Sequence, residues 1–89
     1  MLTKSLALEL SSWGITVNAV GPGLITETNL GGSLDESYLK SVIPSIPLAR
    51  AGHPNEVAGA ISFLSSDMAA YITGAMLVVD GGMLLSARL

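Results

Sequence analysis

Apolar residues recur at helical spacing at the start of the chain. Along one face of a helix lie Leu2, Leu6, Leu10 and Trp13. Gly14 follows directly, and glycine is the residue that most often ends a helix. The pattern therefore predicts an amphipathic helix that ends at Gly14.

A nearly continuous apolar run, Ile15 to Val20, comes next. Such a run over strand length is typical of a strand covered on both faces. The run is followed by Gly21-Pro22-Gly23, where proline fixes its φ and lacks an N–H group, and the glycines permit close backbone approach. We expect a strand over residues 15–20 that ends in a shaped turn, at the sheet edge where α/β proteins bind ligands.

Residues 24–47 lack a regular pattern. Gly31-Gly32 is followed by Ser33-Leu34-Asp35-Glu36, a capping-box pattern that predicts a short helix through Ile43. The two glycines and, on the other side, Pro44 and Pro47 bound this segment, which suggests a movable flap that closes over a substrate. A plain surface loop with one helical turn is an equal alternative.

A second amphipathic helix is predicted to begin at Pro54, because proline is favoured in the first turn of a helix. Apolar residues continue it at helical spacing over 57–64, and it ends near Ser65-Ser66. After a short turn and Gly74, the apolar run Met76–Val79 predicts a buried strand. The order helix, strand, helix, helix, strand indicates an α/β fold with a parallel strand pair joined through helices.

Composition changes this picture in one respect. Charged residues make up only 12% of the 89 residues, whereas a typical soluble domain carries about 25%. A chain this short buries a smaller share of its apolar groups than a larger domain does. We therefore expect much of its apolar surface to face missing chain or another subunit.

The charge and residue counts exclude several classes of function. The net charge is −3 and the four Lys or Arg residues are scattered, so no basic stripe is present to bind nucleic acid. The absence of cysteine and the single histidine argue against a zinc site. Glu9, Asn18, Asp67 and Asp80 interrupt the apolar stretches, so a membrane span is not expected, and a secretory signal is not supported.

Several blocks together resemble the C-terminal portion of the short-chain dehydrogenase/reductase family. They occur in the family's order and spacing, and the resemblance covers most of the chain. The blocks are Trp13 to Gly23, Ile46-Pro47-Leu48-Ala49-Arg50, Pro54-Asn55-Glu56-Val57-Ala58, Phe63 to Asp67, Tyr71-Ile72-Thr73-Gly74 and Val79-Asp80-Gly81-Gly82.

The resemblance implies that residues 1–89 are the C-terminal part of one Rossmann-type, doubly wound parallel sheet, with about two strands and three helices present. It also implies hydride transfer between NAD or NADP and a small alcohol or carbonyl substrate. The family's Gly-rich phosphate turn, catalytic Ser and Tyr-x-x-x-Lys pair lie upstream of the match. Tyr38 and Tyr71 do not replace that pair, because Val42 and Ala75 stand where lysine is required. We assign no catalytic residue, and the choice between NAD and NADP, like the substrate, stays open.

The resemblance also implies a set of cofactor-binding residues. Pro22 and Gly23 shape the nicotinamide-side wall, and the backbone of Ile25 faces the carboxamide. The family's usual threonine position is Glu27, which would repel a phosphate, so its neighbours Thr26 and Thr28 are the candidate hydroxyl groups. Ordinary turn and capping roles are the alternative for both threonines. The substrate lid is assigned to Leu30, Leu34, Tyr38 and Val42.

Four other polar residues are given structural roles. His53 is expected to be a capping or surface group, and Asn18 to fix strand and turn by hydrogen bonds. The Asp80 carboxylate either caps backbone N–H groups or pairs across an interface. Arg50 is expected to pair with an acidic neighbour, with substrate contact as the alternative.

Two classes of function follow. In the first, the chain is a segment of an NAD(P)-dependent oxidoreductase; in the second, it is a non-catalytic product that pairs with full-length subunits. The helix Val57–Leu64 and the strand Met76–Val79 resemble family elements that meet across a two-fold axis, so a homo-oligomer is expected. We expect a cytoplasmic protein, with peroxisomal location as the alternative, because Ala87-Arg88-Leu89 resembles a small-basic-Leu address.

Overall fold

The computed structural model describes residues 1–26 and 35–86. In chain order, the helices are α1 (Leu2–Leu10), α2 (Glu36–Val42), α3 (Pro54–Leu64) and α4 (Met83–Ser86), and the strands are β1 (Ala19–Pro22) and β2 (Met76–Val79). Short 3-10 helices occupy Ser11–Trp13, Ile43–Ser45 and Asp67–Ala69. The fold is therefore α/β, as the sequence predicts.

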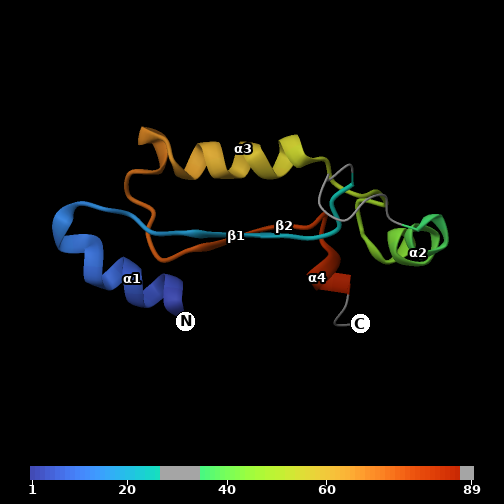
Figure 1. The fold of residues 1–89 in the computed structure, drawn as a ribbon, viewed down its shortest axis with the longest axis horizontal. Helices are drawn as coiled ribbons and strands as arrows, with labels where there is room; N and C mark the ends of the chain where they lie inside the picture. Colours follow the sequence, from blue (N-terminus) through green and yellow to red (C-terminus); the bar gives the residue numbers. More distant parts are fainter. Residues whose placement is uncertain (27–34, 87–89) are drawn as a thin grey trace.

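The two strands form a parallel pair. Their register runs from Ala19 opposite Met76 to Pro22 opposite Val79. α3 lies along one face of the pair, whereas α1 and α4 lie on the other side, near its two ends (Figure 1). α2 lies beyond the carboxyl ends of the strands. The chain passes from β1 through α2 and α3 to β2, which confirms the predicted parallel pair joined through helices.

Local chemistry sets the ends of α1 and α3. Gly14 has a left-handed φ of 73°, and its N–H donates to the Ser11 carbonyl at 3.0 Å. This arrangement ends the first helical segment where the sequence predicts it. Pro54 is the first residue of α3, and His53 is its N-terminal cap residue. His53 thus occupies the cap position and is exposed, which agrees with the expected capping or surface group.

The cap of α2 differs from the predicted one. The sequence pattern assigns the cap to Ser33, which lies outside the described residues. In the structure the cap is Asp35, whose carboxylate accepts the N–H of Ser37 at 3.2 Å and its hydroxyl at 2.9 Å. Aspartate caps a helix as well as serine does. Asp35 directly precedes the first residue of α2, so the helix begins after Asp35.

The predicted bounds of the first strand are wrong. β1 begins at Ala19, because the backbone of Val17 bonds to the Thr73 hydroxyl at 3.0 Å and the strand ladder starts only where the Ala19 N–H donates to Ala75. Pro22 continues the strand instead of ending it. Since Ala19 and Gly23 both donate to the β2 side, the alternation of parallel pairing directs the Pro22 nitrogen to the opposite edge, where a missing N–H removes no bond.

Asn18 holds the amino ends of the two strands together. Its side-chain NH₂ donates to the Ile72 carbonyl at 3.0 Å, and its side-chain oxygen accepts the Ala75 N–H at 3.0 Å. The N–H of Gly74 also donates to Val17 at 2.7 Å. These contacts confirm the structural role expected for Asn18.

The described residues contain a fourth α-helix, whereas the sequence predicts about three helices. α4 follows β2 after a turn in which Gly81 and Gly82 have φ values of 65° and 92°. It spans only four residues, which is too short for a helical periodicity to appear in the sequence. The Asp80 carboxylate caps it by accepting the N–H groups of Gly82 at 2.8 Å and Leu84 at 3.0 Å, which is the first of the two roles expected for Asp80.

Much of the apolar surface is open. Among the described residues, the buried hydrophobic side chains are those of Ala7, Ile46 and Ala69. Met76 and Val78 of β2 are 50% and 43% exposed, so the expectation of strands covered on both faces is wrong for this chain by itself. The accessible surface is 6539 Å², whereas a compact monomer of 9.1 kDa exposes about 4,900 Å².

This open surface agrees with the low charge content of the sequence. Within residues 1–26 and 35–86, no helix is both long enough and apolar enough to cross a membrane.

Candidate functional site

The carboxyl ends of β1 and β2 meet at Gly23. The Gly23 N–H donates to the Val79 carbonyl at 3.0 Å. A Cβ atom at Gly23 would lie 2.6 Å from the Cβ of Asp80 and 2.9 Å from its Cα, closer than real side chains approach. Glycine is therefore required here by the proximity of the two backbones, and not by an unusual φ.

The turn after β1, residues Leu24–Thr26, is held by the backbone of Gly52. The Gly52 N–H donates to the Leu24 carbonyl at 2.9 Å, and the Thr26 N–H donates to the Gly52 carbonyl at 3.0 Å. Ile25 and Gly52 thereby form an isolated parallel bridge. We call residues Leu24–Thr26 the strand-end turn.

Two hollows flank the strand-end turn. The first has a volume of about 570 Å³ and lies between the end of β1 and α3. The described residues that line it are Pro22, Gly23, Leu24, Ile25, Pro54, Val57, Ala58 and Ile61. Both its size and its apolar character are typical of small-molecule sites. An apolar wall of this kind can contact the face of a flat ring.

The second hollow has a volume of about 460 Å³ and shares Leu24 and Ile25 with the first. Its lining includes three charged side chains, Arg50, Glu56 and Asp80. The strand-end turn thus separates a purely apolar recess from one with charged groups at its border.

Arg50 and Glu56 form a bidentate ion pair beside Gly52. The two N···O distances are 2.7 Å and 2.9 Å. Glu56 also accepts the His53 N–H at 3.0 Å. The hydrogen bonds from Arg50 and, secondly, from His53 lower the pKa of the Glu56 carboxyl to about 2, and the carboxylate raises the pKa of Arg50. The pairing expected for Arg50 is confirmed.

The structure brings four of the five predicted cofactor-binding residues together. Pro22, Gly23 and Ile25 line the apolar hollow, and Thr26 closes the strand-end turn next to them. The Thr26 hydroxyl points to the Gly52 carbonyl at 3.4 Å. Thr28 lies outside the described residues. The cofactor role of all five residues stays a prediction.

The predicted lid is described only in part. Tyr38 and Val42 lie on α2, beyond the strand ends (Figure 1), with Tyr38 exposed and Val42 half-buried. Leu30 and Leu34, like the targeting signal predicted at Ala87-Arg88-Leu89, lie outside the described residues. Within the described part of the chain, His, Asp and Glu side chains form no group of three that could hold a metal ion.

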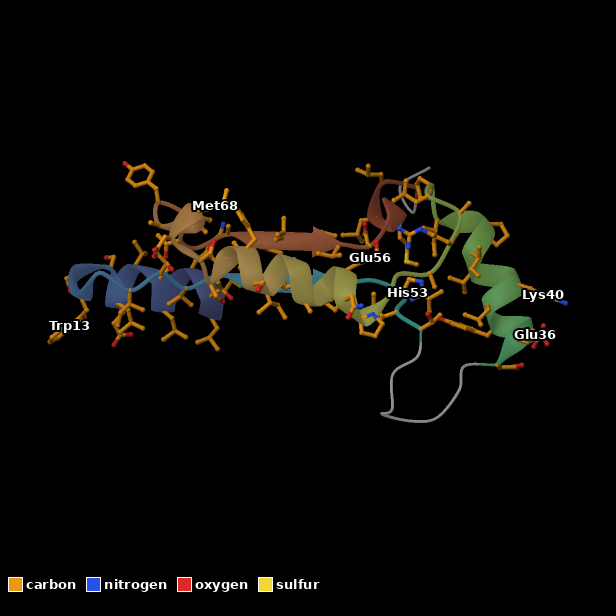
Figure 2. All side chains as sticks on the ribbon, turned by 90° about the horizontal axis from the view of Figure 1, so that it is seen from above. Trp13, Glu36, Lys40, His53, Glu56 and Met68 are labelled. Carbon is orange, nitrogen blue, oxygen red and sulfur yellow. The ribbon has the colours of Figure 1, made fainter. Side chains whose placement is uncertain are left out.

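The role of Gly52 was missed by sequence reasoning. The only signal was a glycine two residues before Pro54, in a segment with no periodicity. Its pairing with Ile25 depends on a contact between residues 27 positions apart, which local sequence patterns do not reveal. In Figure 2, His53 and Glu56 lie together at the start of α3, on the side toward α2.

The parallel pair, the covering helix and the ligand-sized hollow at the strand ends define one flank of a Rossmann-type nucleotide-binding fold. The family described as Enoyl-(Acyl carrier protein) reductase matches residues 1–84. The chain belongs to the short-chain dehydrogenase/reductase family, whose members are NAD(P)-dependent oxidoreductases.

Relatives of known name support this assignment. The chain is 54% identical over 80 residues to a 3alpha-hydroxysteroid dehydrogenase of Mediterraneibacter gnavus, covering 90% of this chain and 32% of that protein. It is 48% identical over 81 residues to the 3-oxoacyl-[acyl-carrier-protein] reductase FabG of Escherichia coli, covering 91% and 33%. It thus spans about a third of the length of the curated relatives it matches.

Solved structures agree in fold. A short chain dehydrogenase from Bacillus anthracis matches 93% of this chain and 32% of its own, with a TM-score of 0.82 and 46% identity. A structure from Agrobacterium tumefaciens with bound NADP matches 94% of this chain and 35% of its own, with a TM-score of 0.85 and 49% identity.

Proposed function

We propose that this chain supplies the nicotinamide-side wall of an NAD(P)-dependent oxidoreductase that interconverts alcohols and carbonyls. The observation that carries the proposal is the strand-end turn at the carboxyl ends of two parallel strands, which follows the close approach of Gly23 to Asp80 and is hydrogen-bonded to Gly52. Ligands of open α/β sheets bind at this edge. The bound NADP of the Agrobacterium tumefaciens structure is consistent with a dinucleotide as the ligand.

In this proposal Pro22, Gly23 and Ile25 form an apolar wall for the nicotinamide ring, and backbone groups of the strand-end turn meet its carboxamide. Thr26 and Thr28 are the candidate hydroxyl donors. Leu30, Leu34, Tyr38 and Val42 cover the substrate. The wall positions the cofactor, and the acid or base comes from a Tyr-x-x-x-Lys pair outside these 89 residues.

A chimera tests the proposal. In it, this chain replaces the segment that it matches in the Agrobacterium tumefaciens protein, whose remaining length supplies the rest of the fold. We expect the chimera to unfold cooperatively, bind NADP or NAD, and reduce a member of a ketone and aldehyde panel. The 89-residue chain alone is expected to show no turnover with either cofactor.

Two results would contradict the proposal. One is reproducible turnover by the 89-residue chain alone, since it would require an acid or base within this chain. The other is a folded chimera that binds neither dinucleotide, measured by nicotinamide fluorescence or calorimetry, because the wall would then not serve a cofactor.

A second candidate function is a non-catalytic module that pairs with full-length subunits. The observation that favours it is the exposed apolar surface of β2 and α3, where Met76 and Val78 and the α3 side chain Ile61 are about half exposed. In this candidate the α3 helix over 57–64 and the strand Met76–Val79 form the contact with a second subunit. This second function requires that the chain associates with a full-length subunit and does not require cofactor binding. The first function requires that the chimera binds the cofactor.

A further inference from the structure

Residues 46–52 cross the carboxyl ends of both strands, and we call them the strap. At one end, Ile46 is buried under Gly81, where a Cβ atom would come within 2.9 Å of the Ile46 side chain. The Leu48 N–H donates to the Gly81 carbonyl at 3.1 Å. At the other end, Gly52 pairs with Ile25. The strap therefore links the turn after β2 to the strand-end turn after β1.

The Arg50–Glu56 pair acts on the two peptide groups that flank Gly52. Arg50 donates to the Ala51 carbonyl at 3.1 Å, and the N–H of that same peptide group, which belongs to Gly52, donates to Leu24. Glu56 accepts the His53 N–H at 3.0 Å. The carbonyl of that second peptide group, which belongs to Gly52, accepts from the strand-end turn.

Each peptide group is thus held at both ends. One end bonds to the ion pair, and the other bonds to the backbone on either side of Ile25. A peptide group is planar, so fixing its outer end also fixes the direction of its inner end. Hydrogen bonds in such a chain also polarise and strengthen one another.

We propose that Arg50 and Glu56 are positioning residues, which orient the two peptide groups of Gly52 and thereby the backbone of Ile25. This inference rests on the proposed function, in which that backbone faces the cofactor carboxamide. It assigns the ion pair a geometric role. The Arg50 and Glu56 side chains are 51% and 42% exposed, and exposed pairs add little to global stability.

Amide hydrogen exchange in the folded chimera tests the geometric step. In Arg50→Met, we expect the amides of Gly52 and Thr26 to exchange about two- to five-fold faster. This range corresponds to the loss of an exposed ion pair whose contribution to stability is at the upper end of the usual range. The amides of Gly74 and Ala75, held by Val17 and Asn18, should not change. Lys4→Met, which removes one exposed cation on α1, is the matched control and should leave all four amides unchanged.

The same variants in the chimera test the consequence for the cofactor. Arg50→Met should raise the dissociation constant and KM of the dinucleotide by about two- to five-fold, with little change in the KM of the carbonyl substrate. Glu56→Gln should have a smaller effect, because its amide oxygen still accepts the His53 N–H. Arg50→Lys, which keeps the charge but not the bidentate geometry, should restore only part of the affinity.

The outcomes separate the two proposals. Failure of the unsubstituted, folded chimera to bind a dinucleotide would remove the proposed function, whatever the exchange data show. If the chimera binds but Arg50→Met leaves its affinity unchanged, the positioning role is wrong. It is also wrong if the amides of Gly52 and Thr26 are unprotected in the unsubstituted chimera, or if the control amides accelerate equally, since that would indicate a general loss of structure.

Discussion

At the scale of single residues, the strand ends are built by glycine, because two backbones come closer there than a side chain permits. Gly23 lies against the Cα and Cβ of Asp80, and Gly52 lies against Ile25, where a Cβ atom would be 3.0 Å from the side chain. These are the positions at which a methyl group changes the site most. Gly81 is close to the Ile46 side chain in the same way, whereas a Cβ atom at Gly59 would meet nothing within 4 Å.

Gly23→Ala is expected to destabilise the chimera. The new methyl group would lie 2.6 Å from the Asp80 Cβ, so the strand ends must separate, at a cost of about 1–3 kcal/mol in the free energy of unfolding. Gly59→Ala is the matched control, because a Cβ atom there meets nothing within 4 Å and alanine favours a helix by up to about 1 kcal/mol. Urea unfolding measures both; an equal response of the two variants would contradict the close approach.

The titration of Glu56 reports whether its ion pair with Arg50 of the strap is formed. Its pKa in the folded chain is about 2, below the ordinary value of 4.5. The stabilisation from its ionised form is therefore complete above about pH 4.5 and is lost as the pH falls toward about 2. Carboxyl resonances followed by NMR should show this low midpoint. In Arg50→Met the midpoint should rise toward the ordinary value; an unchanged midpoint would show that Arg50 is not its cause.

At the scale of elements, the amino ends of the strands are held by one amide side chain and their carboxyl ends by the strap. Asn18 bridges the Ile72 carbonyl and the Ala75 N–H, so it fixes the register of β1 against β2 before the ladder begins. α3 then packs over the pair, and its first turn carries Glu56 to the strap. The Asn18 hydrogen bonds at the amino ends of the strands and the strap at their carboxyl ends therefore determine where the strand-end turn lies.

Asn18→Ala should weaken the strand pair in the chimera. It removes both hydrogen bonds and leaves two partly buried backbone groups without their partner, at a cost of about 1–3 kcal/mol. Asn55→Ala, at an exposed position of α3, is the matched control and should change stability by less than about 0.5 kcal/mol. Thermal unfolding compares the two, and a similar effect of both substitutions would remove the register role of Asn18.

At the scale of the whole molecule, the chain is elongated and open. Its extents are 49 × 31 × 22 Å, and its radius of gyration is 15.6 Å, whereas a compact domain of this length has about 12 Å. Trp13 and Met68, at the end of the molecule away from α2 (Figure 2), are 77% and 84% exposed. So large an apolar exposure is rare in soluble monomers and marks contact surfaces.

We therefore expect the 89-residue chain to associate when it is studied alone. Sedimentation at micromolar concentration should show species larger than a monomer, with binding of an apolar dye that the folded chimera lacks. The chimera covers the open surfaces with the remaining fold, so its dye binding is the control. A compact monomer of the 89-residue chain with a cooperative thermal transition would contradict this expectation and the claim that its apolar faces need cover.

The sequence alone determined the features that local chemistry controls. Gly14 ends a helix because it accepts a left-handed φ, Pro54 begins one because its missing N–H is not needed there, and Met76–Val79 is a strand because it is continuously apolar. The parallel order followed from the helices between the strands. The parts that were wrong, the bounds of β1 and the cover of the sheet, depend on partners far away in the chain.

Only the tertiary structure decided the site. It placed Gly52 against Ile25 and turned the peptide groups of the strap toward the strand-end turn. The physical reason is that these contacts join backbone groups, which every residue carries and which leave almost no mark on residue type. Residue patterns record helix periodicity and turns, whereas the approach of two distant backbones is fixed only by how the strands and α3 pack.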